Sequence, residues 1–210
     1  DRPNNKRTVT TIAPDGSRTV TVYVGGRLDS VMRQNSGAGQ VTQTTYGYDA
    51  HGRQSTITDA RNGTTSYGYN NADQVVSVTT PAPGTGLAAQ ATITHYNKSL
   101  QATNVIQPDG TSVTNEYHLT GLLKKTSGSR TYPVAYTYDY AGRMKTMKTW
   151  QNFAGNAGMP TTTWNYNPYR GWLDNKRYAD NTGPSYTYTA EGRLNPRRSE
   201  ERRGGKECRS

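Results

Sequence analysis

Tyrosines two residues apart recur along this chain of 210 residues. In Tyr46-Gly47-Tyr48 and Tyr136-Thr137-Tyr138 the rings alternate with a small or polar residue. Successive side chains of an extended chain point to opposite faces, so the alternation places both rings on one face. The pattern therefore predicts β-strands that end in tyrosine. Thr and Gly are abundant and no long stretch has apolar residues at i, i+3, i+4 and i+7, so helices are not expected.

A turn signal follows these tyrosine pairs. Asp49-Ala50-His51-Gly52 and Asp139-Tyr140-Ala141-Gly142 place an acceptor side chain before a glycine that tolerates positive φ, and Arg53 or Arg143 then begins the return strand. Each unit of pattern is therefore predicted to contain two strands and two turns. The second turn is marked by Pro14-Asp15-Gly16, Arg61-Asn62-Gly63, Pro108-Asp109-Gly110 and Asp180-Asn181-Thr182-Gly183.

The pattern is an internal repeat that fills the chain. Its aligned tyrosines are spaced by 25, 21, 27, 21, 21, 28 and 22 residues, which gives a base period of 21. The three longer spacings contain Gly-, Pro- or Asn-rich stretches at 34–40, 81–90 and 151–160, which we expect to be surface loops. The eight aligned tyrosines are Tyr23, Tyr48, Tyr69, Tyr96, Tyr117, Tyr138, Tyr166 and Tyr188.

The repeat predicts the fold class. It is an all-β protein in which hairpins stack into a curved, spiralling antiparallel sheet, stabilised by contacts between neighbouring repeats. No linker separates blocks of different composition, so residues 1–197 are predicted to be one repeat region of about eight repeats.

Composition supports a folded but unusual protein. Only 31% of residues are hydrophobic and the net charge is +10, values that would suggest disorder if the chain did not also contain 16 tyrosines. No apolar run is long enough to span a membrane. The chain opens mid-pattern at Asp1 without a methionine, so we expect a fragment whose export signal lies elsewhere.

The last residues, 198–210, have a different composition. They contain no aromatic or β-branched residue, and they resemble a translated sequencing adapter. We interpret them as a probable non-native tail; the alternative is a genuine basic tail. The tail holds five Lys or Arg, three Glu and the single cysteine, Cys208, so residues 1–197 keep a charge of +8 and have no thiol chemistry.

No pattern predicts catalysis. Asp49 and Asp139 occupy a turn position that holds Asn70, Asn97 or Asn167 in other copies, and an amide cannot replace a carboxyl in proton transfer. The histidines, His51, His95 and His118, occur singly without metal-ligand spacing. The sequence thus predicts no catalytic, cofactor-binding or metal-binding residue, no cofactor, and no enzymatic activity.

The basic residues favour a structural role. One Arg or Lys follows most turns, and stacked repeats would align Arg27, Arg53, Arg143 and Arg193 against tyrosine rings as cation–π pairs. Contact with a glycan or another polyanion is the alternative, with Trp150, Trp164 and Trp172 as candidate sugar platforms. Specific nucleic-acid binding is disfavoured because the charges do not cluster in one patch.

The motif Tyr-x-Tyr-Asp-x-x-Gly-Arg at a period near 21 resembles the YD repeat of the Rhs family, which includes shell subunits of insecticidal toxin complexes and the teneurins of animals. The resemblance covers residues 8–197, and the stretch from Asn165 to Leu173 is similar to bacterial members in particular. In that family the repeats form a spiral β-shell that in bacteria encloses a C-terminal toxic polypeptide. No match to the core-associated region or to a toxin domain is present, so no catalytic residue carries over.

The resemblance implies a function. We expect a non-catalytic segment of the wall of a shell that encloses or displays a C-terminal effector, in a secreted or cell-surface protein. The expected partners are neighbouring repeats and the effector of a longer chain, without a membrane span. The alternative is a glycan-binding or cell-surface adhesion module.

Overall fold

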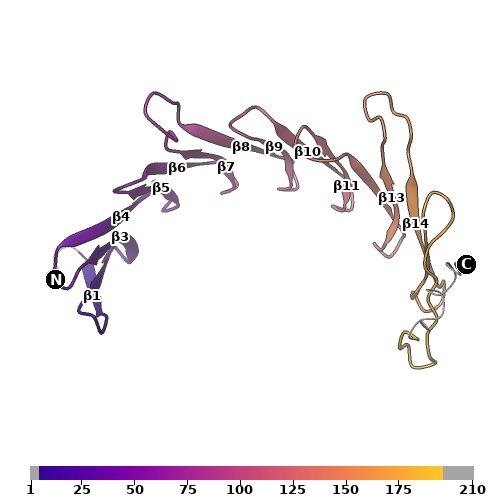
Figure 1. Ribbon diagram of the computed structural model, residues 1–210, viewed down its shortest axis with the longest axis horizontal. Coiled ribbons are helices and arrows are strands. Elements are labelled where there is room, and N and C mark those ends of the chain that lie inside the picture. Colours follow the sequence, from indigo (N-terminus) through magenta and orange to yellow (C-terminus); the bar gives the residue numbers. More distant parts are fainter. Residues whose placement is uncertain (1–4, 196–210) are drawn as a thin grey trace, which may run out of the picture. The chain divides into compact units, whose positions relative to one another are not determined.

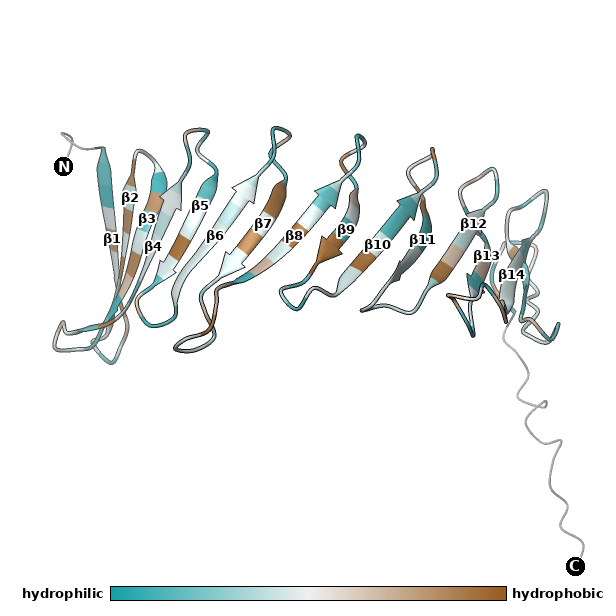
Figure 2. Cartoon of the chain, turned by 90° about the horizontal axis from the view of Figure 1, so that it is seen from above, coloured by the Kyte–Doolittle hydropathy of each residue, from teal (hydrophilic) through white to brown (hydrophobic). Residues whose placement is uncertain are grey.

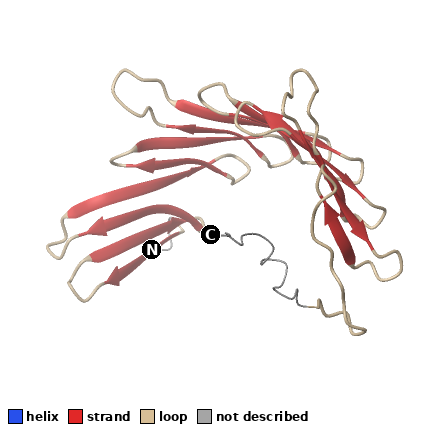
Figure 3. Ribbon diagram, turned by 45° about the vertical axis from the view of Figure 1, so that its right-hand side comes forward, coloured by secondary structure: helices blue, strands red, loops and turns tan. Residues whose placement is uncertain are grey.

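The structure is a computed structural model that describes residues 5–195, and every regular element in that range is a strand (Figure 3). Paired strands in this range run antiparallel, so the predicted all-β antiparallel fold is confirmed. The predicted tail at 198–210 lies outside the described residues and stays a prediction. No helix in the described range is long and apolar enough to cross a membrane.

The chain divides into two compact units, considered separately. Unit one is Asp1–Asn115 with Gly128–Arg130, and unit two is Glu116–Ser127 with Thr131–Ser210. In unit one, nine strands follow each other in sequence order, each pairing with the next (Figure 1). They are β1 (Lys6–Ile12), β2 (Arg18–Val24), β3 (Arg27–Gln34), β4 (Gln40–Tyr48), β5 (Gln54–Asp59), β6 (Gly63–Tyr69), β7 (Val75–Thr80), β8 (Gln90–Tyr96) and β9 (Ala102–Ile106).

Unit two has the same sequential order. It contains β12 (Val134–Tyr138), β13 (Met144–Thr149), β14 (Thr161–Tyr166) and β15 (Leu173–Arg177). Two strands, β10 (Ser112–Tyr117) and β11 (Leu123–Gly128), contribute residues to both units. After β15 the pairing thins to the isolated bridges Asn175–Ser185 and Tyr188–Leu194, so the last repeat keeps the turn geometry with little strand.

A β-bulge lies immediately before the aligned tyrosine in six repeats. At Tyr48, for example, Gly47 pairs with Thr56 whereas Tyr48 pairs with Gln54, so Ser55 is an extra residue in the facing strand. A bulge bends its strand and increases the local twist, and its recurrence applies the same bend once in each of these repeats. The register shifts occur at Tyr23, Tyr48, Tyr69, Tyr96, Tyr138 and Tyr166.

The sheet has almost no buried core. Trp150, with 7% of its surface exposed, is the one buried hydrophobic residue in the described range, and no polar residue there is buried. Polar and apolar residues mix along the strands, with apolar stretches on β7 and β9 (Figure 2). The strands are partly exposed rather than sandwiched, so contacts within the sheet itself must supply most of its stability.

Two of the three long spacings form the expected connections, between β3 and β4 and between β7 and β8. The third, after β13, is more ordered than a simple surface loop. Its backbone forms a bridge between Asn152 and Ala157, and the N–H of Gln151 donates to the Gly158 carbonyl, which extends the β13–β14 hairpin. Trp150 lies at its base, donating Nε1–H to Asn156 at 2.9 Å and contacting Phe153 edge-on at 5.3 Å.

Candidate functional site: the tyrosine ladder

The aligned tyrosines form a ladder of hydrogen bonds between repeats. In six repeats the tyrosine hydroxyl donates to a backbone carbonyl in the first two residues of the return strand of the preceding repeat, at 2.7 to 3.0 Å. The pairs are Tyr48 with Leu28, Tyr69 with Gln54, Tyr96 with Val75, Tyr138 with Leu123, Tyr166 with Met144 and Tyr188 with Leu173. Five of these six bonds satisfy a carbonyl next to a bulge, where regular strand pairing is interrupted; the exception is the bond to Leu123.

A second contact comes from the residue just after each turn, which we call the ladder position. Its side chain packs on the tyrosine ring of the next repeat: the guanidinium carbons of Arg27, Arg53 and Arg143 lie 5.6, 4.5 and 4.3 Å from the ring centroids of Tyr48, Tyr69 and Tyr166. The predicted cation–π pairing is therefore confirmed for these three arginines. Arg193 has no ring contact within residues 5–195.

Two further residues pack on an aligned tyrosine in the same way and were not identified from the sequence. Arg7 pairs in register with Tyr23, with its guanidinium 5.9 Å from the ring, so the pattern reaches into β1. Trp172 packs on Tyr188 with centroids 4.9 Å apart, an aromatic pair in place of a cation–π pair. Neither residue follows an Asp-x-x-Gly turn. Spacing along the sequence from the aligned tyrosines is the signal that would have identified both.

The turn glycine lies close to the ladder side chain of the preceding repeat. A Cβ on Gly171 would lie 2.6 Å from Nη1 of Arg143, and a Cβ on Gly192 would lie 2.8 Å from the Trp172 ring. A Cβ on Gly52 would overlap Nη2 of Arg27. These glycines also have φ between +71° and +84°, which other residues rarely adopt. Glycine is therefore required here both by backbone conformation and by close approach.

The turn itself is closed by a side-chain acceptor. Oδ1 of Asp49 accepts backbone N–H bonds from His51 and Arg53, both at 2.9 Å. Asn70 does the same for Ala72 and Gln74, at 2.9 and 3.0 Å. The amide thus reproduces the carboxylate's role in the turn, as expected for an Asx turn.

The second terminal atom of the turn side chain, Oδ2 of aspartate or Nδ2 of asparagine, contacts the side chain four residues later. Oδ2 of Asp49 accepts from both Nε and Nη2 of Arg53, at 2.7 and 2.6 Å, in an ion pair that uses one carboxylate oxygen, and Asp139 binds Arg143 likewise. Asn97 instead donates from Nδ2 to Gln101 at 3.2 Å. In these turns aspartate therefore accompanies arginine, and Asn70 and Asn97 accompany glutamine, a pairing that the substitution pattern alone did not reveal.

The ion pairs change how the aspartates titrate. Burial by itself would raise the pKa of Asp49, but hydrogen bonds and charge from Arg53 outweigh it and hold the pKa below the ordinary value. Asp139 is held below its ordinary pKa in the same way by Arg143. A lowered pKa keeps both groups ionised at neutral pH, which suits a structural ion pair and not a proton donor.

This geometry predicts the outcome of substitutions at Asp49. Asp49→Asn keeps the turn acceptor and loses only the ion pair, whereas Asp49→Ala loses both, so we expect a several-fold larger rise in hydrogen exchange around residues 49–53 for Asp49→Ala. Hydrogen-exchange mass spectrometry of the intact chain measures this. Equal effects of the two substitutions would contradict the turn role of the side chain.

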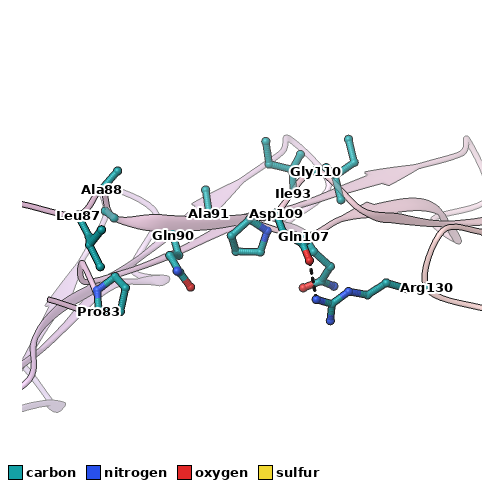
Figure 4. A pocket seen from close by; sticks show the side chains of 13 residues that line it. Pro83, Leu87, Ala88, Gln90, Ala91, Ile93, Gln107, Asp109, Gly110 and Arg130 are labelled. Atoms are coloured by element: carbon teal, nitrogen blue, oxygen red, sulfur yellow. Dashed lines mark hydrogen bonds and ion pairs between the residues drawn. The ribbon is translucent and has the colours of Figure 1, made fainter.

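Unit one has an open groove of about 750 Å³ (Figure 4). Apolar residues such as Leu87 and Ile93 line it, and at one end Arg130 binds Asp109 at 2.7 Å. Hydrogen bonds from Thr111 and Arg130 lower the pKa of Asp109 to about 2. The groove lining holds no nucleophile beside a base, so nothing in it points to chemistry.

The three histidines, which the sequence analysis set aside, are not brought together. His51 and His95 lie on separate repeats, and His118 contacts Tyr138 edge-on at 5.9 Å and the Tyr136 carbonyl at 3.2 Å. Within residues 5–195 no three His, Cys, Asp or Glu side chains could share a metal ion. That the chain has no catalytic, cofactor or metal site stays a prediction.

The candidate sugar platforms already carry protein contacts. Lys176 lies over Trp164 at 5.2 Å, and Arg170 lies over Trp172 at 4.7 Å, while Tyr188 packs against Trp172 as well. Trp150 is buried. A bound sugar would have to use the remaining ring surface of Trp164 or Trp172.

Comparison with known proteins identifies the same repeat. The RHS Repeat family matches residues 48–85, which contain two of the aligned tyrosines. A search of curated proteins gives no match.

Among solved structures, TcdB2-TccC3-TEV matches with a TM-score of 0.60 and 16% identity, over 90% of this chain and 11% of that chain. The Photorhabdus luminescens Tc holotoxin pore matches with a TM-score of 0.61 and 16% identity, with the same coverage of 90% and 11%. This chain thus spans about one ninth of the length of those chains, and at this identity the likeness shows the fold. Residues 48–85 thus match an RHS Repeat, and the ladder carries the same contacts through further repeats from Arg27 to Tyr188.

Proposed function

We propose that this chain is a non-catalytic segment of the wall of an Rhs-type shell, which encloses or displays a C-terminal effector. The observation that carries the proposal is a sheet with one buried hydrophobic residue in its described range, held within each unit by contacts between successive repeats. Such a sheet extends by adding repeats and leaves its faces available, which suits a wall. The likeness to toxin-complex structures supports the proposal at the level of fold.

The same likeness supports a secreted or surface-delivered location, which we include in the proposal. It also makes the partners neighbouring repeats and an effector on a longer chain. Glycan binding has no observation in its favour beyond the three tryptophans, whose rings already have protein contacts.

The test is the complete reading frame. We expect many further repeats and a variable C-terminal domain. The expressed full-length protein, imaged by electron microscopy, should show a hollow particle, and the C-terminal domain should resist protease until the wall is denatured. A frame that ends within a few repeats, or a C-terminal domain that is cleaved as fast as a free domain, would refute the proposal.

A further inference from the structure

A pocket of about 250 Å³ lies on unit two, on the face formed by β11, β12 and β13. Its lining contains three lysines with one histidine and no acidic residue. Glu116 is the acid that contacts this group, 3.5 Å from both Lys124 and Lys125. Three lysines thus face one carboxylate, and the net charge at the pocket is positive.

The strand register explains the shape of this pocket. Ala135 pairs with Lys125 on one side and with Lys148 on the other, so the three side chains point to the same face in one row. The methyl of Ala135 leaves a hollow between two long cationic side chains. Because neighbouring strands are about 4.8 Å apart, the two lysine backbones are about 10 Å apart.

Lys148 is the lysine that lacks a partner. Lys125 has Glu116 at 3.5 Å and lies over the Phe153 ring at 4.8 Å. Lys148 is partly buried, yet within the described part of the chain its ammonium makes no ion pair or hydrogen bond. Partial burial of an unpaired charge costs free energy, which an anionic ligand would recover.

The lining also indicates the class of ligand. Trp150 borders the pocket but is buried, with its Nε1–H already bonded to Asn156, so it offers little ring surface for stacking. The hydroxyls of Thr137 and Thr146 bond to each other at 2.6 Å. Recognition here must come mainly from the ammonium groups, which favours carboxylates over a sugar ring.

We propose that this pocket binds an acidic polypeptide segment, with carboxylates of an extended Asp- or Glu-rich stretch on Lys148 and Lys125. In an extended peptide, side chains at i and i+2 lie on one face about 7 Å apart, and the flexible lysine stems cover the difference from about 10 Å. This proposal goes beyond the wall role and does not depend on enclosure of an effector.

The experiment uses the full chain and a fluorescein-labelled peptide of alternating Glu and Ser, with a Gln and Ser peptide as the neutral match. Fluorescence anisotropy at about 0.15 M salt should show saturable binding of the Glu peptide only, because long-range attraction is largely screened there. Lys148→Gln should weaken binding about tenfold, in the range of one charge-assisted hydrogen bond, and Lys148→Arg should retain it.

Lys145→Gln is the matched control, since Lys145 is an exposed lysine on the same strand and does not line the pocket. An equal loss with Lys145→Gln would show attraction to net charge and overturn the proposal. So would absence of peptide binding, or tighter Lys148-dependent binding of a sulfated oligosaccharide or inorganic phosphate. Because none of these results concerns protease protection of an effector, failure here leaves the wall proposal separately testable.

Discussion

Gly52→Ala is expected to destabilise its repeat by about 3 kcal/mol, roughly twice the effect of Gly26→Ala. Both glycines have nearly the same backbone conformation, with φ of +84° and +80°. An L-residue with a Cβ pays about 1 to 2 kcal/mol for that conformation. The added methyl meets nothing within 4 Å at Gly26, but at Gly52 it overlaps the guanidinium of Arg27.

The difference between the two substitutions therefore isolates the close approach. Arg27 would have to leave its place over the Tyr48 ring, where its guanidinium carbon is 5.6 Å from the centroid. Because contacts join only neighbouring repeats, the readout should be local: hydrogen exchange in peptides covering β3 and β4 of the intact chain. Equal protection in the two variants would show that backbone strain alone explains the need for glycine in this turn.

Two natural exceptions support this reasoning. Asp73 and Leu100 occupy the equivalent turn position with φ of +60° and +63°. The ladder residue of the preceding repeat contacts each of them. Arg53 binds the Asp73 carboxylate, and the Gln74 side chain donates to the Leu100 carbonyl at 2.8 Å. A residue other than glycine is tolerated at this position where the ladder residue of the preceding repeat contacts its side chain or its backbone favourably.

The sequence was sufficient to predict the hairpins, their turns and the stacking of arginine on tyrosine. All three depend on short-range patterns: alternation in Tyr46-Gly47-Tyr48, an acceptor before glycine in the turn, and arginine directly after it. These local preferences agree with the final fold, so little tertiary information was needed to predict them.

The features that were missed depend on register between strands. A bulge such as the one at Ser55 leaves no residue signature, because Ser, Asp, Val, Thr and Lys all occupy the extra position. Trp172 joins the ladder although its turn is one residue longer and ends in Arg170-Gly171. The row that joins Lys125, Ala135 and Lys148 appears only once three strands are paired.

Substitutions at Tyr138 and Tyr140 test whether the ladder contact stabilises the sheet, because the two tyrosines are two residues apart and only Tyr138 makes that contact. Tyr140 is 92% exposed, whereas Tyr138 donates its hydroxyl to the Leu123 carbonyl at 2.9 Å and packs against His118. We expect Tyr138→Ala to lower the free energy of unfolding of unit two by about 2 to 3 kcal/mol, somewhat below the cost of removing a fully buried ring. Tyr138→Phe should cost about 1 kcal/mol, the value of one hydrogen bond.

Tyr140→Ala should leave stability within about 0.5 kcal/mol of the parent, because little of its ring contacts the protein. The three tryptophans lie in unit two, so urea unfolding followed by tryptophan fluorescence measures all three variants. A comparable loss for Tyr140→Ala would mean that any tyrosine of this hairpin stabilises the sheet, and the ladder would lose its special role.

The ladder also predicts an alkaline limit to stability. Burial, with a smaller contribution from Tyr136, raises the pKa of the Tyr138 phenol above its ordinary value. Folding therefore favours the protonated form, so this contribution is fully present below the unfolded-state pKa of about 10 and is lost as pH rises through the higher folded-state pKa. Tyr138→Phe has no phenol to ionise there, so its free energy of unfolding should fall less steeply than the parent's above pH of about 10. Parallel slopes for the two proteins would show that Tyr138 ionises as readily in the folded sheet as in the unfolded chain, and that its hydroxyl is not held in the ladder.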